Sequence, residues 1–177
     1  MSNLEASLRA GIRDIPDFPS LGIVFKDITP LLGNAPLFRS ATDAMAKAWR
    51  NEHIDRVVAI ESRGFLFGAP MAQALGVGFV PMRKRGKLPF RTCREEYALE
   101  YGTDSLEIHE DAIESGATVL IVDDVLATGG TAAAACRLVE RLGGKVAGCS
   151  FLIALTFLPG LKALAGRRVE AMLRYDS

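Results

Sequence analysis

Residues 119–131 read VLIVDDVLATGGT, and this stretch decides the fold. Its first four residues are all apolar and mostly β-branched, which is typical of a strand buried on both faces of a parallel sheet. Asp123 and Asp124 follow at the end of that strand, before a loop of small residues. An Ala-rich segment at 132–142 has helical character. The stretch therefore predicts a strand, a loop and a helix in succession.

The loop at 128–131 offers backbone N–H groups with little side-chain bulk at the start of the predicted helix. Unpaired N–H donors and the positive end of the helix dipole make such a loop an anion site. Carboxylates beside a phosphate site suit a phosphorylated sugar with free hydroxyl groups. The alternative is a plain turn built by Asp-Asp and Gly-Gly, and either dipeptide alone would favour it.

The composition limits the class of protein. The chain has 177 residues, of which 49% are hydrophobic, so we expect one domain with a sizeable core. Its 21 basic and 21 acidic residues balance, which argues against a nucleic-acid binder that works through overall positive charge. Three widely spaced cysteines and a polar N-terminus without signal-peptide character predict a cytoplasmic setting. No apolar run is long enough to span a bilayer.

Outward from residues 119–131, strand and helix patterns alternate along the chain. Strands are expected at 56–60, 77–82, 145–156 and 169–175, and helices at 2–12, 36–51, 65–75 and 159–165. The β-α-β-α-β order predicts an α/β fold with a doubly wound parallel sheet flanked by helices.

Other segments of the sequence join the predicted site. Residues 61–64 (ESRG) form a second strand–loop–helix junction, where a cation and small residues could hold another anion. Both loops would lie at the carboxyl edge of the sheet, where ligands bind. Residues 83–91 carry cations at five of nine positions, but acidic residues follow, so no extended basic surface is expected.

Two further segments are expected to cover the site. Residues 85–103 are polar, poorly periodic and long for a connection, which indicates a mobile lid, and the alternating residues 105–109 are expected to return as an antiparallel strand. Residues 15–32 hold three prolines and a glycine, which exclude a long regular element and predict an ordered cover. Val24 and Phe25 in this cover would suit a flat apolar ligand, although it could also be a lid without a ligand.

Four segments together resemble the adenine phosphoribosyltransferases, a family of type I phosphoribosyltransferases. The segments are 16–30, 61–65, 83–89 with 99–102 (LEYG), and 119–131. The last of these resembles the binding motif for phosphoribosyl pyrophosphate (PRPP) that many phosphoribosyltransferases share. The Pro-rich segment and LEYG are what indicate adenine.

The resemblance implies an enzyme of purine salvage that makes AMP and pyrophosphate from adenine and PRPP, with Mg²⁺ as cofactor. It implies one type I phosphoribosyltransferase domain over residues 1–177, with a base-binding hood at 1–34 and a flexible flap at 83–110. A homodimer is implied as well. Two alternatives are an enzyme for another purine base (xanthine, guanine or hypoxanthine) and a PRPP-sensing regulator without catalysis.

The resemblance also implies roles for single residues. Asp123 and Asp124 would hold the ribose hydroxyls and are candidate additional ligands of a Mg²⁺ ion that PRPP mainly holds. The 5′-phosphate would bind Ala127, Thr128, Gly129, Gly130 and Thr131. Pyrophosphate would bind Ser62, Arg63 and Gly64, with further positive charge from Arg83 and Lys87. Adenine would contact Val24, Phe25, Lys26 and Leu155.

Catalysis is expected to be electrostatic, because loss of pyrophosphate leaves positive charge on the sugar and negative charge on the leaving group. Arg63, Lys87 and Mg²⁺ would stabilise the leaving group. Glu100 and Tyr101 would ride on the flap, with Glu100 handling a proton of the purine; the alternative for Glu100 is a solvated carboxylate.

Three features depart from the pattern of relatives. Lys26 stands where relatives often have Arg, so its contacts with the base are expected to differ. Ala154 stands where many have an acidic residue, which puts an inherited role there in doubt. The C-terminal element after residue 175 is expected to be short.

Overall fold

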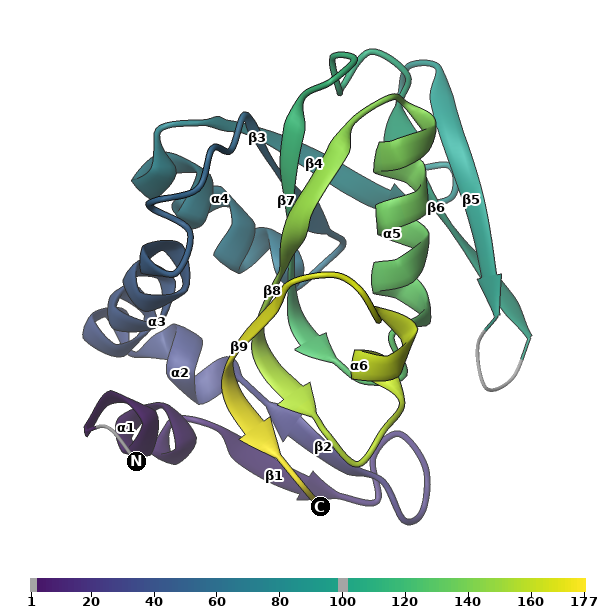
Figure 1. The fold of residues 1–177 in the computed structure, drawn as a ribbon. Coiled ribbons are helices and arrows are strands. Elements are labelled where there is room, and N and C mark those ends of the chain that lie inside the picture. The colour runs from purple at the N-terminus through teal and green to yellow at the C-terminus, as the bar shows by residue number, and fades with distance from the viewer. Residues whose placement is uncertain (1–2, 99–101) are drawn as a thin grey trace.

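A seven-stranded mixed sheet forms the centre of the computed structural model, which describes residues 3–98 and 102–177 (Figure 1). Its order is β5-β6-β4-β3-β7-β8-β9. The parallel strands are β4 (Gly78–Lys84), β3 (Arg56–Ile60), β7 (Thr118–Leu126), β8 (Lys145–Leu155) and β9 (Val169–Tyr175). Antiparallel strands β5 (Thr92–Ala98) and β6 (Thr103–His109) extend one edge. The predicted α/β architecture is confirmed.

Helices cover both faces of this sheet. Alternate residues of β7 explain why its sequence is wholly apolar: Val119 and Ile121 pack in the core beneath α5 (Gly130–Arg141), whereas Leu120 and Val122 pack in the core on the opposite face. That second core includes residues from α1 (Asn3–Ala10), α2 (Thr29–Gly33), α3 (Ala35–Lys47) and α4 (Gly64–Leu75). The last helix, α6 (Gly160–Ala163), lies between β8 and β9 in the chain.

The Pro-rich cover contains a small hairpin of β1 (Arg13–Pro16) and β2 (Val24–Asp27). Each strand has four residues, in keeping with the expectation that no long regular element forms here. In Figure 1 the hairpin lies beside the carboxyl ends of β8 and β9. It is thereby placed at the sheet edge where the predicted site lies.

Strand β5 was not expected from the sequence. It pairs with β6 along its length, and its inward side chains Cys93 and Tyr97 pack against the core under α5. Glu95 lies between them and forms ion pairs with Arg137 and Arg141 of α5. A carboxylate at an inward position breaks the apolar alternation that identifies a strand, and only its partners on α5 make it stable there.

Within residues 3–98 and 102–177, no helix has the length and apolar character needed to cross a membrane. Residues 99–101, between β5 and β6 in the sequence, lie outside the described part of the chain.

Candidate active site

A cleft of about 690 Å³ opens at the carboxyl edge of the parallel sheet. Its walls come from the β2 hairpin, the loop after β3, the end of β7 with its following loop, and the end of β8. Eleven of the residues predicted for the site line it: Val24, Phe25, Lys26, Ser62, Arg63, Asp123, Asp124, Ala127, Thr128, Thr131 and Leu155. The structure therefore brings together residues that were predicted to bind the base, the sugar, the phosphate and the pyrophosphate.

The paired carboxylates lie at the end of β7. Asp123 Oδ1 accepts a hydrogen bond from the Asp124 backbone N at 2.9 Å, and Asp124 is 4% exposed. Burial and the neighbouring charge of Asp124 raise the pKa of Asp123 well above its ordinary value. Burial also raises the pKa of Asp124, against the opposing effect of Arg63. The Asp124 carboxylate is buried and that of Asp123 is half-buried, and hydroxyl donors from a ligand would stabilise their charge.

Arg63 connects the loop after β3 to two other walls. Its Nε lies 2.8 Å from Asp124 Oδ2, and its Cζ lies 4.9 Å from the centroid of the Phe25 ring. Asp124 Oδ2 is buried and, apart from this ion pair, has no hydrogen-bond partner among the described residues. A buried acceptor without a donor is unusual and suits a ligand hydroxyl or a cation.

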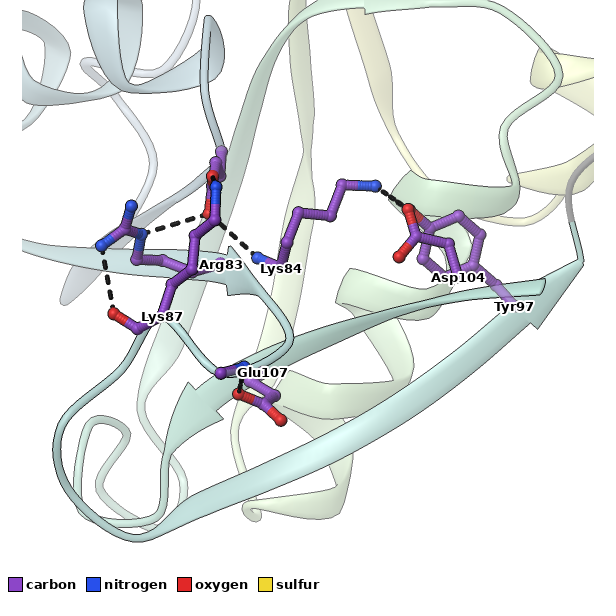
Figure 2. Close-up of polar contacts among 8 residues, drawn as sticks. Arg83, Lys84, Lys87, Tyr97, Asp104 and Glu107 are labelled. Carbon is purple, nitrogen blue, oxygen red and sulfur yellow. Dashed lines mark hydrogen bonds and ion pairs between the residues drawn. The ribbon is translucent and has the colours of Figure 1, made fainter.

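Glu61 binds the basic residues at the end of β4 and in the loop that follows it. Its carboxylate accepts hydrogen bonds from Arg83 Nε at 3.1 Å, from the Lys84 backbone N at 3.0 Å and from Lys87 Nζ. Figure 2 shows that the Lys84 side chain instead points towards Tyr97 and Asp104 of the β5–β6 hairpin. Lys84 Nζ donates to Tyr97 Oη at 2.7 Å and pairs with Asp104. One basic segment thus joins the loop after β3 to the predicted flap.

Comparison with known proteins identifies the family. The model of the phosphoribosyl transferase domain matches residues 29–156. An adenine phosphoribosyltransferase of Myxococcus xanthus is 56% identical over 98% of this chain and 95% of its own length. The chain belongs to the adenine phosphoribosyltransferase family.

Solved structures of the family share this fold. The adenine phosphoribosyltransferase of Thermoanaerobacter pseudethanolicus is 54% identical, with a TM-score of 0.94 over 97% of this chain and 99% of that one. The Saccharomyces cerevisiae enzyme was solved with an iminoaltritol bisphosphate and adenine. It is 44% identical, with a TM-score of 0.92 over 98% of this chain and 100% of that one. The resemblance drawn from the four sequence segments is confirmed.

Glycines predicted at the site also serve close packing. A Cβ on Gly64 would lie 2.8 Å from Asp123 Oδ1, so glycine lets the start of α4 approach the end of β7. Gly129 has a φ of +84°, and a Cβ there would lie 2.7 Å from Ala163 Cβ of α6. These positions, with Gly130 at the start of α5, shape the loops rather than line the cleft.

Some site residues differ from expectation. Arg83 and Lys87 bind Glu61 and are not among the described residues that line the cleft, whereas Lys84 is. Neither Glu61 nor Lys84 was predicted to have a role, although both adjoin predicted residues in the sequence. Glu100 and Tyr101 lie outside the described residues. Ala154 is fully buried in β8, where it pairs with Leu126 of β7.

Glu61→Gln is expected to lower the free energy of unfolding by about 1–2 kcal/mol at neutral pH, because Arg83 and Lys87 lose their buried counterion. Burial alone would raise the pKa of Glu61, but hydrogen bonds from Lys87 and the Lys84 backbone and the charge of Arg83 lower it below its ordinary 4.5. A lowered pKa stabilises the fold above the ordinary value, and that contribution is lost as the pH falls through the folded-state pKa.

Urea denaturation at neutral pH and at about pH 4 measures the free energy of unfolding of both proteins. The difference between the native protein and Glu61→Gln should shrink as the pH falls. The exposed Glu110 gives a matched control, since Glu110→Gln should leave the free energy of unfolding unchanged. A difference that does not depend on pH would contradict the role of the Glu61 charge.

Proposed function

We propose that this chain transfers the 5-phosphoribosyl group of PRPP to adenine, which gives AMP and pyrophosphate in purine salvage. The observation that carries the proposal is the composition of the cleft, where the paired carboxylates of β7 lie between a loop of small residues and the hood hairpin. The names of the relatives and the adenine bound to the yeast enzyme support the same substrate.

We assign the sugar phosphate to the end of β7 and the following loop. Asp123 and Asp124 accept hydrogen bonds from the ribose hydroxyls, which supply the donor that Asp124 Oδ2 lacks among the described residues. Residues 127–131 lead into α5 and bind the 5′-phosphate through backbone N–H groups at the start of this twelve-residue helix. The base lies between Val24 and Phe25 on one side and Leu155 on the other, with Lys26 nearby.

We assign pyrophosphate to the loop Ser62–Gly64, with Arg63 as its main cation. Arg83 and Lys87 exchange Glu61 for the anion, which stabilises the charge that develops on the leaving group. Arg63 lies against Asp124, so the cation assigned to the leaving group adjoins the carboxylates assigned to the sugar. Glu100 and Tyr101 remain predicted as residues of the flap that closes over the reacting centre, with Tyr101 binding PRPP or AMP and Glu100 handling a proton of the purine.

We propose Mg²⁺ as the cofactor. Among the described residues, no three His, Cys, Asp or Glu side chains gather to hold a metal. Mg²⁺ commonly binds one or two carboxylates together with substrate phosphates, and Asp123 and Asp124 supply two adjacent carboxylates at the wall of the cleft. When bound, the ion would neutralise the phosphate oxygens of PRPP.

We further propose a cytoplasmic homodimer. The free cysteines Cys93, Cys136 and Cys149 support a reducing compartment. The exposed Leu66 and Phe79, on α4 and β4, give an apolar surface that a second copy could cover.

Incubation with PRPP, Mg²⁺ and a panel of bases tests the function. Adenine should release pyrophosphate much faster than guanine, hypoxanthine or xanthine, and a chelator of divalent cations should stop the reaction. Turnover with another purine and not with adenine would show that the enzyme is specific for that other base. Binding of PRPP without turnover of any base would favour the sensing role instead.

A further inference from the structure

Tyr175 ends β9 at the wall of the cleft that holds Leu155. Leu155 and Tyr175 are paired in the β8–β9 register. The Tyr175 carbonyl oxygen accepts hydrogen bonds from the Thr156 backbone N at 2.8 Å and from Thr156 Oγ1 at 3.0 Å. The backbone of Tyr175 is therefore fixed to the same strand end as the proposed base contact.

Two cationic side chains from different elements of the hood lie over the Tyr175 ring. Lys26 Nζ of β2 lies 4.4 Å from the ring centroid, and Arg9 Cζ of α1 lies 4.7 Å from it. The Lys26 side chain is 8% exposed and pairs with Asp14 Oδ1 of β1 at 2.8 Å. Arg9 Nη2 also donates to the Arg174 carbonyl oxygen at 2.8 Å. A desolvated ammonium over an aromatic face is among the stronger cation–π contacts.

The hairpin depends on such contacts for its position. A two-stranded hairpin with four residue pairs is marginally stable alone, so its place beside the sheet is set by what its side chains touch. Phe25 touches Arg63, which a bound anion would engage, whereas Lys26 touches Tyr175, which belongs to the rigid sheet. The Lys26 contact thus joins β2 to the sheet through residues that are not assigned to PRPP.

We propose that Tyr175 is a positioning residue for the base: its ring holds Lys26 and thereby sets β2 at a fixed distance from Leu155. This inference rests on the proposed function, because it assumes that the base lies between these walls. Tyr175 is not among the described residues that line the cleft. Its loss should therefore weaken adenine binding and leave PRPP binding intact.

The test compares Tyr175→Leu with Tyr175→Phe. Tyr175→Leu removes the aromatic face and should raise the KM for adenine about tenfold, with the KM for PRPP and kcat nearly unchanged. Tyr175→Phe keeps the face and should rescue the adenine KM. Arg13→Met is the matched control, because it breaks the exposed ion pair with Asp27 one register position away without touching the ring.

Hydrogen exchange of the amides at 24–27 separates this inference from the function itself. Exchange should be faster in Tyr175→Leu than in the native protein and Tyr175→Phe, whichever base the enzyme uses. If the KM values for adenine and PRPP rise together, the role of Tyr175 is merely structural. If Tyr175→Phe behaves like Tyr175→Leu, or exchange is unchanged in both variants, the cation–π anchor is overturned.

Discussion

Asp123→Asn is expected to stabilise the substrate-free protein and to remove most of its ability to use PRPP. Burial and the charge of Asp124 raise the pKa of Asp123, so its ionised form opposes folding at neutral pH. Asparagine removes that charge and keeps the oxygen that accepts from the Asp124 backbone N at 2.9 Å. The same charge is the acceptor proposed for a ribose hydroxyl, so stability and activity should change in opposite directions.

The sign of the pH dependence follows from the raised pKa. Between the ordinary aspartate pKa of 3.8 and the raised folded-state value, the folded protein binds more protons than the unfolded chain. The stability of the native protein therefore falls as the pH rises through this window. The advantage of Asp123→Asn should be greatest at neutral pH and should shrink as the pH falls into the window.

Thermal unfolding and steady-state kinetics measure both effects. Each kcal/mol of stabilisation should raise Tm by about 2–4 °C in a chain of this size. Loss of a charged hydrogen-bond acceptor for the sugar should lower kcat/KM for PRPP about 100-fold. Glu114→Gln is the control, since Glu114 is an exposed carboxylate near the opposite end of β7 and should change neither quantity. A destabilised Asp123→Asn with normal PRPP use would contradict the proposed role.

The predictable parts of this fold are those that local pattern determines. Residues 119–122 were expected to be buried on both faces, and alternate side chains do enter the two cores. Their strand places Asp123 and Asp124 at the sheet edge, so strand direction alone brought most predicted residues into one cleft. Strand β3 was predicted with the bounds that it has in the structure, because it is also wholly apolar after Arg56.

The parts that were missed depend on partners distant in the sequence. Strand β5 was missed because Glu95 is stabilised by Arg137 and Arg141, more than forty positions away. Glu61 was passed over for the same reason, since Arg83 lies in β4 and Lys87 in the loop after it, more than twenty positions away. A charged residue that faces the core can be assigned to a strand only when its counterion is known. The periodicity of the sequence does not identify that counterion.

Gly129→Ala is expected to lower the free energy of unfolding by about 2–5 kcal/mol and to abolish tight PRPP binding. Two costs add at this position. A residue other than glycine is strained at a φ of +84°, and its Cβ would lie 2.7 Å from Ala163 Cβ and 2.9 Å from the Gly160 backbone. The loop must then move away from α6, which displaces the N–H groups proposed to bind the 5′-phosphate.

Gly166→Ala separates the cost of backbone strain from the cost of the steric clash with α6. Gly166 has a φ of +81°, but a Cβ there would meet nothing within 4 Å, so only the backbone strain of about 1–2 kcal/mol should appear. Urea denaturation and calorimetric titration with PRPP compare the variants. Equal destabilisation by both would show that close packing on α6 is unimportant. Normal PRPP binding by a folded Gly129→Ala would remove the loop from the phosphate site, because the displacement that the substitution requires could not leave those N–H groups in place.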